Sequence, residues 1–349
     1  MKAFSGLRHW LRSLLVVCAL GYPLVLFALA VGFYVIGENW WLTGAGLYAP
    51  RVIFATPLPF AVLILWFTRL RRLLWTQLVA AIILAFPLFG FVLPSASTAR
   101  AGAPNLRVLS FNVNSAFAGA DAIAQKIFAE SPDIVLLQEA PWGRALNDAL
   151  RTRFQYVESS TQFIIASRYR ITSSTDPARL PFFGRLRSPR FMRWVVETPL
   201  GAITIYSVHP ISPRGVLHLH QFRAALHEIR TGELFAGDPE ADVRSNAALR
   251  EFQLQTAADM ARRESLPVII AGDTNLPTLS VVFRKHLSGF VDAFRSASWG
   301  LGYTYPDRHP FLRLDRILTS DKLRAVSFRV DCQGFSDHLC VVADIQASP

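Results

Sequence analysis

Two polar side chains follow an apolar run in the stretch Pro267–Pro277, whose sequence is PVIIAGDTNLP. The run Val268–Ala271 predicts a buried strand, and Pro277 prevents that strand from continuing. Side chains two positions apart point to the same side of a strand, so Asp273 and Asn275 would face one small volume. This is the geometry of a site at the edge of a rigid sheet. The same two residues could instead close an Asx turn on their own backbone.

Further polar residues stand beside other apolar runs in residues 105–349. They are Asn112, Glu139, His209, Asp315, Asp337 and His338. Taken alone, Asn112 is typical of a turn, His209 of a surface histidine, and Asp315 of an ion pair with a neighbouring arginine. As a set they predict a single polar site at strand ends.

The residue types in this set favour a hard divalent cation. Oxygen ligands such as Glu139 suit Mg²⁺ or Mn²⁺, and the set contains no cysteine, which disfavours structural zinc. A divalent ion beside Asp and two His can polarise a phosphoryl oxygen, orient a water and stabilise the leaving oxygen. The set therefore indicates phosphoester chemistry.

Six short motifs follow one another in a characteristic order. They are FNVN at 111–114, PDIVLLQE at 132–139, VHP at 208–210, GDTN at 272–275, LDRIL at 314–318 and SDH at 336–338. Together they resemble the endonuclease/exonuclease/phosphatase superfamily, which includes DNase I-like nucleases, sphingomyelinases and inositol-polyphosphate phosphatases. The resemblance covers about residues 105–345. It implies an α/β fold, a two-sheet β-sandwich flanked by helices.

The resemblance also implies which residues bind a metal. Glu139 would be the main ligand of Mg²⁺ or Mn²⁺, with Asn112 beside it and Asp337 near the metal. Some nuclease branches, notably abasic-site endonucleases, carry an acid two positions after the first Asn, where this chain has Asn114. That difference, together with His209, argues against abasic-site repair.

The remaining motif residues would carry the catalytic roles of the family. Asp273 would activate or orient the attacking water, and Asn275 would bind a phosphate oxygen. His338 would contact the phosphate, held in position by Asp315. His209 resembles the second histidine of the DNase I and sphingomyelinase branches, a candidate acid for the leaving oxygen.

The first hundred residues differ in composition from the rest. They carry eight Lys or Arg and one Glu, a net charge of +7, whereas the remainder carries only +4. The pI near 10.1 is therefore weak evidence for nucleic-acid binding by the remainder. Residues 13–37 contain no charge over 25 positions, against roughly 20 needed to cross a bilayer. A signal peptide is the alternative interpretation of this segment.

Two more uncharged stretches favour a multi-pass anchor over a cleaved signal. We predict three transmembrane helices, at about 14–36, 50–68 and 73–93. Basic residues cluster before the first span and in the second loop, so the positive-inside rule places the N-terminus in the cytoplasm. Three crossings then leave the rest of the chain periplasmic or extracellular. The chain is thus expected to be a membrane protein of the inner or plasma membrane.

Residues 94–104, PSASTARAGAP, are predicted to be a linker, and residues 105–349 one α/β catalytic domain. Predicted strands are 106–112, 132–137, 163–168, 194–197, 202–208, 268–271, 314–319, 325–330 and 339–345. Predicted helices are 121–130, with Asp121 as N-cap, and 244–264. Cys332 and Cys340 could form a disulfide outside the cytosol, or could be small buried side chains.

Two further segments leave alternatives open. Arg179–Trp194 carries five arginines interleaved with aromatics and no acid. It suits a membrane-facing rim, single-stranded nucleic acid, or a solvated hairpin whose aromatics pack inward. The segment with His218, His220 and His227 is predicted to be a variable loop or lid helix. Its His and Glu spacing would also suit a metal site, but no strand end lies beside it.

The predicted function is hydrolysis of a phosphorylated substrate. The tether and the Arg/aromatic segment favour a lipid-linked phosphate at the outer membrane face, a layout similar to bacterial membrane-bound members linked to glycopeptide resistance. An external nuclease is the alternative, since nucleic acid is possible but not favoured by a net charge of +4. A non-catalytic membrane scaffold is the third.

Overall fold

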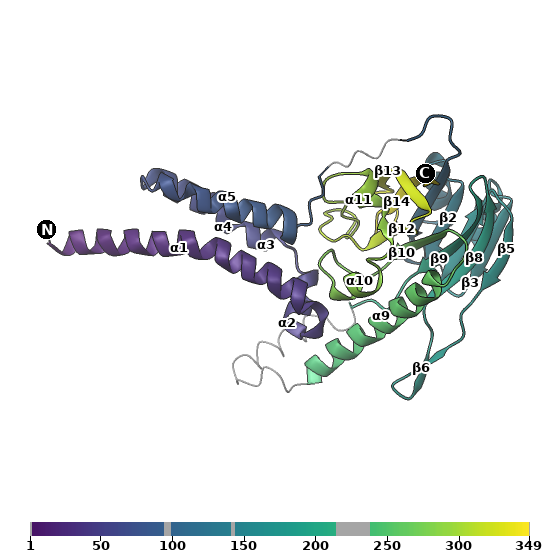
Figure 1. Ribbon diagram of the computed structural model, residues 1–349, viewed down its shortest axis with the longest axis horizontal. Coiled ribbons are helices and arrows are strands. Elements are labelled where there is room, and N and C mark those ends of the chain that lie inside the picture. Colours follow the sequence, from purple (N-terminus) through teal and green to yellow (C-terminus); the bar gives the residue numbers. More distant parts are fainter. Residues whose placement is uncertain (1, 94–98, 141–143, 214–237, 349) are drawn as a thin grey trace. The chain divides into compact units, whose positions relative to one another are not determined.

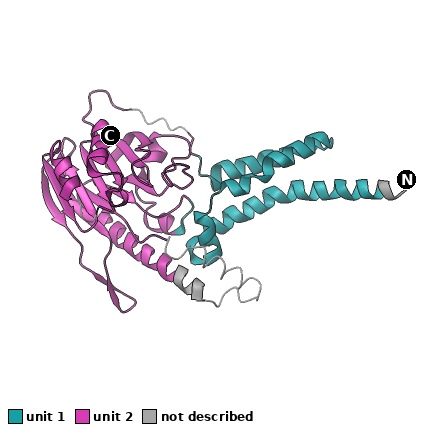
Figure 2. Ribbon diagram, turned by 180° about the vertical axis from the view of Figure 1, so that it is seen from behind, with its two compact units in different colours: residues 1–91, 279–281 teal, residues 92–278, 282–349 magenta. Residues whose placement is uncertain are grey.

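The computed structural model describes residues 2–93, 99–140, 144–213 and 238–348. It divides into two compact units (Figure 2). The first comprises Met1–Phe91 with Leu279–Val281, and the second comprises Val92–Thr278 with Val282–Pro349. The predicted segment with three histidines between 218 and 227, and the first half of the predicted linker, lie outside the described residues.

The first unit is helical. Its helices are α1 (Lys2–Val35), α2 (Trp41–Tyr48), α3 (Val52–Ala55), α4 (Pro57–Phe67) and α5 (Leu74–Ile83). Gly6–Val35 and Arg71–Leu88 are each long and apolar enough to cross a membrane. The segment between them is bent by 87° between α2 and the α3–α4 pair. By length and composition, the described residues therefore supply two spans, or three if the bent pair is one span.

The second unit contains two mixed six-stranded sheets (Figure 1). The first has the order β13 (Leu323–Asp331), β14 (Cys340–Ala347), β1 (Leu106–Asn112), β2 (Ile134–Gln138), β4 (Phe163–Ser167), β3 (Tyr156–Ser160). The second has the order β11 (Val291–Asp292), β12 (Asp315–Thr319), β10 (Val268–Asp273), β9 (Gly201–Val208), β8 (Phe191–Thr198), β5 (Ile171–Thr175). A separate hairpin pairs β6 (Leu180–Phe182) with β7 (Arg185–Arg187).

Side-chain alternation explains why the central strands are apolar throughout. Val108 and Ile134 of one sheet pack with Ile205 and Ile269 of the other in a shared core. The opposite faces are covered by helices, listed here in chain order: α6 (Ala120–Ala129), α7 (Arg144–Arg151), α9 (Asp238–Arg262) and α10 (Val281–His286). Helix α11 (Ala293–Ala297) instead packs Ala293 and Phe294 into the shared core. Leu109 and Val135 pack with residues of α6 and α7, and Ile270 with residues of α9. Because these strands are buried on both faces, their sequences are continuous apolar runs and do not alternate between apolar and polar residues.

The two-sheet sandwich flanked by helices predicted from the sequence is confirmed. Every predicted strand has a counterpart, most within two residues of the predicted ends. One local prediction is wrong: α6 begins after Gly119, whose φ is +92°, and Asp121 lies inside its first turn. There the carboxylate favours the positive end of the helix dipole without capping it. The short strands β3 and β5 were not expected, because brief polar segments carry little periodicity. Helix α7 was not expected either, although Leu146 and Leu150 lie four residues apart on its buried face.

A half-buried ion pair fastens α9 to the second sheet. Just after α9, Glu264 accepts hydrogen bonds from Arg193 of β8 at 2.7 and 3.1 Å and from the Tyr206 hydroxyl of β9 at 2.8 Å. The hydrogen bonds from Arg193 hold the pKa of Glu264 below its ordinary value, against the opposing effect of burial. A carboxyl with a lowered pKa stabilises the fold above its ordinary pKa, and this contribution is lost as the pH falls through the lowered pKa.

We therefore expect Glu264→Gln to lower the free energy of unfolding at pH 7 by about 1–3 kcal/mol, the range for hydrogen bonds to charged groups. The matched control is Asp148→Asn, because Asp148 pairs with Arg151 on an exposed helix face; its expected cost is below about 0.5 kcal/mol. Thermal unfolding of the purified protein between pH 7 and pH 3 measures both. If the difference in unfolding free energy between the wild type and Glu264→Gln stays constant down to pH 3, the ionised Glu264 is not the source of that stability.

Candidate active site

Both sheets bring strand termini to one edge. The parallel strands β1 and β2 end together at Asn112 and Gln138, and β9 and β10 end together at Val208 and Gly272. The antiparallel strands beside them begin at this same edge. Asp315, for example, pairs with Asp273 across β12 and β10. The site is thus built from the carboxyl ends of parallel strands and the amino ends of their antiparallel neighbours.

Asp273 is buried and uses its two oxygens differently. Oδ1 accepts the backbone N–H of Asn275 at 2.8 Å, which is an Asx turn. Oδ2 accepts a hydrogen bond from Nδ2 of Asn112 at 3.1 Å. The same Oδ2 lies 3.6 Å from Nε2 of both His209 and His338. The turn and the site are therefore both present in this stretch, and the turn fixes the carboxylate.

Asn112 joins two carboxylates. Its Nδ2 also donates to Oε1 of Glu139 at 3.1 Å, and its Oδ1 accepts the backbone N–H of Asn114 at 3.1 Å. Glu139 follows β2 with φ of +51°, and its Oε1 lies 3.3 Å from Nε2 of His209. The hydrogen bond from His209 lowers the pKa of Glu139 to about 2, although burial opposes this shift. Glu139 is therefore ionised at neutral pH.

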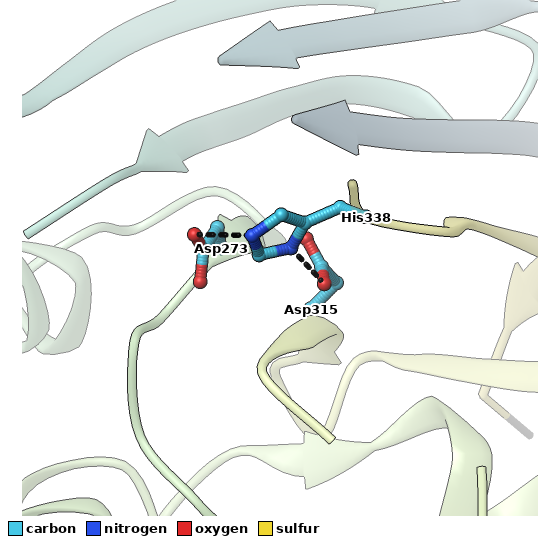
Figure 3. A group of neighbouring side chains, drawn as sticks. All are labelled: Asp273, Asp315 and His338. Atoms are coloured by element: carbon cyan, nitrogen blue, oxygen red, sulfur yellow. Dashed lines mark hydrogen bonds and ion pairs between the residues drawn. The ribbon is translucent and has the colours of Figure 1, made fainter. Parts of the chain in front are cut away.

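His338 is held between two carboxylates (Figure 3). Its Nδ1 lies 2.9 Å from Oδ2 of Asp315, and because a carboxylate only accepts, Nδ1 carries a proton. Burial alone would lower the pKa of His338, but the charges of Asp315 and Asp273 outweigh it and raise the pKa to about 10. Tyr305 stacks on the ring at 4.8 Å. In the absence of a bound cation, His338 is an imidazolium whose Nε2 faces Asp273.

His209 is oriented by a residue that the sequence did not single out. Its Nδ1 lies 2.7 Å from Oε1 of Gln162, an amide oxygen that can only accept, so Nδ1 is the donor. Arg190 donates to the same Oε1 at 3.2 Å. Nε2 of His209 is buried and faces two carboxylates, 3.3 Å from Oε1 of Glu139 and 3.6 Å from Oδ2 of Asp273.

Gln162 and Arg190 stand just before β4 and β8, the antiparallel neighbours of β2 and β9. A polar residue before such a strand lies at the same edge as the residue that ends the parallel one. Their position just before an apolar run is the signal that could have identified them, whereas Asn112, Glu139 and His209 follow such runs. Asp315 begins β12 and His338 precedes β14, so these two residues also lie at the start of their strands rather than at the end.

Two predicted residues lie at the margin of the cluster. Asn275 is buried with φ of +50°, and its Nδ2 donates to the carbonyl oxygen of Pro210 at 3.1 Å. Asp337 is half-buried and accepts a hydrogen bond from the Ser336 hydroxyl at 3.4 Å. Its negative charge contributes to the raised pKa of His338. The direct role predicted for each stays a prediction.

Arg316 supports the Asp273–Asn275 turn from beneath. Its guanidinium is fully buried, and Nη1 donates to the Thr274 hydroxyl and to the carbonyl oxygen of Leu276, both at 2.6 Å. The guanidinium lies over the Phe283 ring, 4.5 Å from its centroid. Burial lowers the pKa of Arg316 to about 9. Arg316 is thereby a structural clamp on the turn, separate from the ion pair with Asp315 considered from the sequence.

The donor atoms fit a hard divalent cation. One ligand atom each of Asp273, Asp315 and His338 lie within 4.8 Å of one another. The carboxylate of Glu139 stands beside this group, linked to Asp273 through Asn112. Such an oxygen-rich set suits Mg²⁺ or Mn²⁺. Asn112 presents a donor nitrogen to both carboxylates here, so its predicted role as an oxygen ligand stays a prediction.

A disulfide lies next to the His338 segment. Cys332 and Cys340 are bonded, with Cα atoms 5.4 Å apart, and both are buried. They enclose residues 333–339, which include Asp337 and His338. The sequence allowed either a disulfide or a pair of small buried side chains, and both descriptions apply to these two cysteines.

Comparison with known proteins gives a family match. The family model described as Endonuclease/Exonuclease/phosphatase family matches residues 109–338. A functionally unknown conserved protein from Enterococcus faecalis V583 is 12% identical, covers 70% of this chain and 100% of its own, and has a TM-score of 0.51. SmcL is 14% identical, covers 69% and 99%, and has a TM-score of 0.50.

A third solved structure is similar to a comparable extent. The endonuclease/exonuclease/phosphatase from Beutenbergia cavernae DSM 12333 is 18% identical, covers 70% of this chain and 72% of its own, and has a TM-score of 0.49. None of the curated proteins matches this chain. At these identities the structural likeness shows the fold alone, which is the DNase I-like sandwich expected from the sequence.

The disulfide gives a prediction. Removing both cysteines with Cys332→Ala and Cys340→Ala should lower the free energy of unfolding by about 2–3 kcal/mol, as expected for a loop this short. The chain has three cysteines, so thiol labelling of denatured, non-reduced protein should modify only Cys18. Cys18→Ser is the matched control and should leave both the stability and the disulfide unchanged. Labelling of three thiols in protein purified without reductant would contradict the bond.

Proposed function

Because this chain belongs to the endonuclease/exonuclease/phosphatase family, we propose that it is a hydrolase that cleaves a phosphate ester or anhydride with Mg²⁺ or Mn²⁺. One observation carries the proposal: Oδ2 of Asp273 meets Nε2 of two histidines and the Asn112–Glu139 pair at one sheet edge. Carboxylates that accept protons and imidazoles that donate them thus surround one volume, as in-line hydrolysis requires.

In the proposed reaction, Asp273 orients a water and accepts its proton at Oδ2. The water oxygen forms a bond to phosphorus as the bond to the leaving oxygen breaks. His338 donates from Nε2 to a phosphate oxygen, and Asp315 keeps its ring in place. His209, whose Nδ1 is committed to Gln162, directs Nε2 to the leaving oxygen and protonates it.

The divalent cation would be held chiefly by Glu139, with Asn112 and Asp337 predicted close to it. When bound, such an ion offsets the negative charge that develops on the phosphoryl oxygens. The low pKa of Glu139 supports this assignment, because the ligand is already ionised at neutral pH. The identity of the ion, Mg²⁺ or Mn²⁺, is part of the proposal.

We propose a phosphorylated lipid or isoprenoid carrier as the substrate. The chain has at least two helices apolar enough to cross a bilayer, which would concentrate the enzyme where such substrates are found. A nuclease acting on external DNA or RNA is the second candidate, because the family description includes nucleases. A catalytically silent scaffold is disfavoured by the complete set of charged and imidazole side chains at the edge.

The location outside the cytoplasm depends on the number of crossings. With the N-terminus inside, three spans place the second unit outside, whereas two spans return it to the cytoplasm. The Cys332–Cys340 disulfide supports three, because structural disulfides persist in oxidising compartments and are rare in the cytosol. We therefore propose that the bent α2 and α3–α4 segment completes one crossing.

Activity assays test the reaction. Purified full-length protein with Mg²⁺ should release phosphate from polyprenyl pyrophosphate, and chelation of the metal should abolish the release. Glu139→Gln and His338→Asn should each lower kcat by at least about 100-fold, the scale for losing one group that stabilises transition-state charge. Asp148→Asn, on the exposed face of α7, is the matched control and should keep wild-type kcat.

Several outcomes would count against parts of this proposal. Cleavage of plasmid DNA without phosphate release from lipid would favour the nuclease. Full activity in both site variants would refute the site assignment. No activity on lipid phosphates, sphingomyelin-like lipids or DNA would favour the scaffold.

Topology is tested separately. A C-terminal alkaline phosphatase fusion, active only outside the cytoplasm, should be active, and a C-terminal green fluorescent protein fusion exported through the general secretory pathway should be dark. The matched control truncates the chain after α1, where the same phosphatase fusion should also be active. If, on the full chain, the phosphatase fusion is inactive and the green fluorescent protein fusion is fluorescent, the chain crosses the membrane twice and the site is cytoplasmic.

A further inference from the structure

The hairpin of β6 and β7 extends from the second sheet without joining it. Its strands pair only with each other, with Leu180 opposite Arg187 and Phe182 opposite Arg185. Two isolated strands are marginally stable in water. Phe182 supplies one attachment, because its ring stacks on Phe252 of α9 with centroids 4.9 Å apart. Because Phe182 is the last residue of β6 before the turn, this contact holds the turn end of the hairpin against α9, and the hairpin lies outside both six-stranded sheets (Figure 1).

The turn of this hairpin has an unusual residue. Phe183 and Gly184 form the two-residue loop, with φ of +44° and +71°. Positive φ at both positions is typical of a type I′ turn, which strongly prefers Asn-Gly or Asp-Gly. A phenylalanine in the left-handed region costs of order 1–3 kcal/mol. The Phe183 ring packs edge-on against Phe182, with centroids 4.5 Å apart, but most of its surface stays exposed and available to a partner outside the folded chain.

The tip is also apolar and exposed. Phe183 is 80% exposed and Leu186 is 63% exposed. Among the described residues of the second unit, six large apolar side chains are exposed, and two of them are within this one hairpin. By contrast, the aromatic residues that follow it, Phe191 and Trp194, are buried in the sandwich. Inward packing therefore holds for those two residues and for Phe182, which contacts Phe252, whereas it fails for Phe183.

Three arginines surround this apolar tip. Arg179, Arg185 and Arg187 are exposed, and none forms an ion pair within the described part of the chain. The stretch Arg179–Trp194 contains no acid that could neutralise them. Arg190 and Arg193 belong elsewhere, since the first contacts Gln162 at the site and the second pairs with Glu264. The hairpin therefore presents uncompensated positive charge beside exposed Phe and Leu side chains.

We propose that the β6–β7 hairpin contacts the headgroup layer of an anionic bilayer, with Phe183 and Leu186 inserted and the arginines on lipid phosphates. Exposed Leu beside Phe favours lipid over single-stranded nucleic acid, whose bases stack on aromatic faces and gain little from an aliphatic side chain. The chain's own apolar helices keep a bilayer within reach. Each arginine near an anionic surface strengthens binding roughly fivefold.

The test uses the full chain in nanodiscs of phosphatidylcholine with or without phosphatidylglycerol. Phe183→Cys in a Cys18→Ser background carries an environment-sensitive fluorophore, while the disulfide leaves no other thiol. The matched control is Asp148→Cys on the exposed face of α7. We expect a blue shift and quenching by doxyl-labelled lipid at the hairpin position but not at the control.

Charge reversal and competition complete the test. Arg185→Glu with Arg187→Glu should reduce quenching at least about 10-fold in phosphatidylglycerol discs. Equal quenching of the labels at Phe183→Cys and Asp148→Cys would overturn the proposal. The proposal would also be overturned if doxyl-labelled lipid does not quench the hairpin label but an oligonucleotide changes its fluorescence. That result would assign the surface to nucleic acid. The readout requires no hydrolysis, so it stands apart from the outcome of the activity assays.

Discussion

The fixed carboxylate of Asp273 is the constraint on which the rest of the site depends. Its Oδ1 is held by the Asn275 backbone, so the group cannot rotate, and Oδ2 must face Asn112 and the two histidines. Burying a charge without partners is strongly destabilising. The imidazoles and the amide are therefore requirements of the fold as well as of the chemistry. Arg316 donates hydrogen bonds to this turn from beneath and so helps to hold the carboxylate of Asp273 in one position.

Strand direction explains how residues distant in sequence reach this one carboxylate. A parallel strand delivers its last residue to the edge, and an antiparallel neighbour delivers the residue just before or at its start. Asn112 and Asp273 arrive by the first route, and Asp315, Gln162 and Arg190 by the second. A mixed sheet can thus double the number of side chains at one edge without lengthening any loop. Two such sheets, packed on one core, suffice for the whole site.

The sequence predicted the parts of this arrangement that leave a periodic or ordered signal. Buried strands appear as uninterrupted apolar runs, and ordered motifs located Glu139, Asp273 and His338. Gln162 carries no such signal, because its importance comes from a tertiary contact with His209. The number of membrane spans has the same difficulty. Hydropathy reports only the length and composition of a segment, so it cannot reveal the 87° bend after α2. Tertiary pairing and chain direction are the information that one-dimensional patterns lack.

Left-handed backbone conformations mark the two surfaces on which this chain is proposed to act. Glu139 and Asn275 have positive φ at the ends of β2 and β10, where no glycine could supply their side chains. Phe183 has it at the hairpin tip, where a glycine or asparagine would fold more easily. Strain of this kind persists only when surrounding structure compensates for it. At the site the compensation comes from buried hydrogen bonds. At the hairpin the described chain supplies a contact between the Phe183 and Phe182 rings, and we infer that the bilayer adds to it.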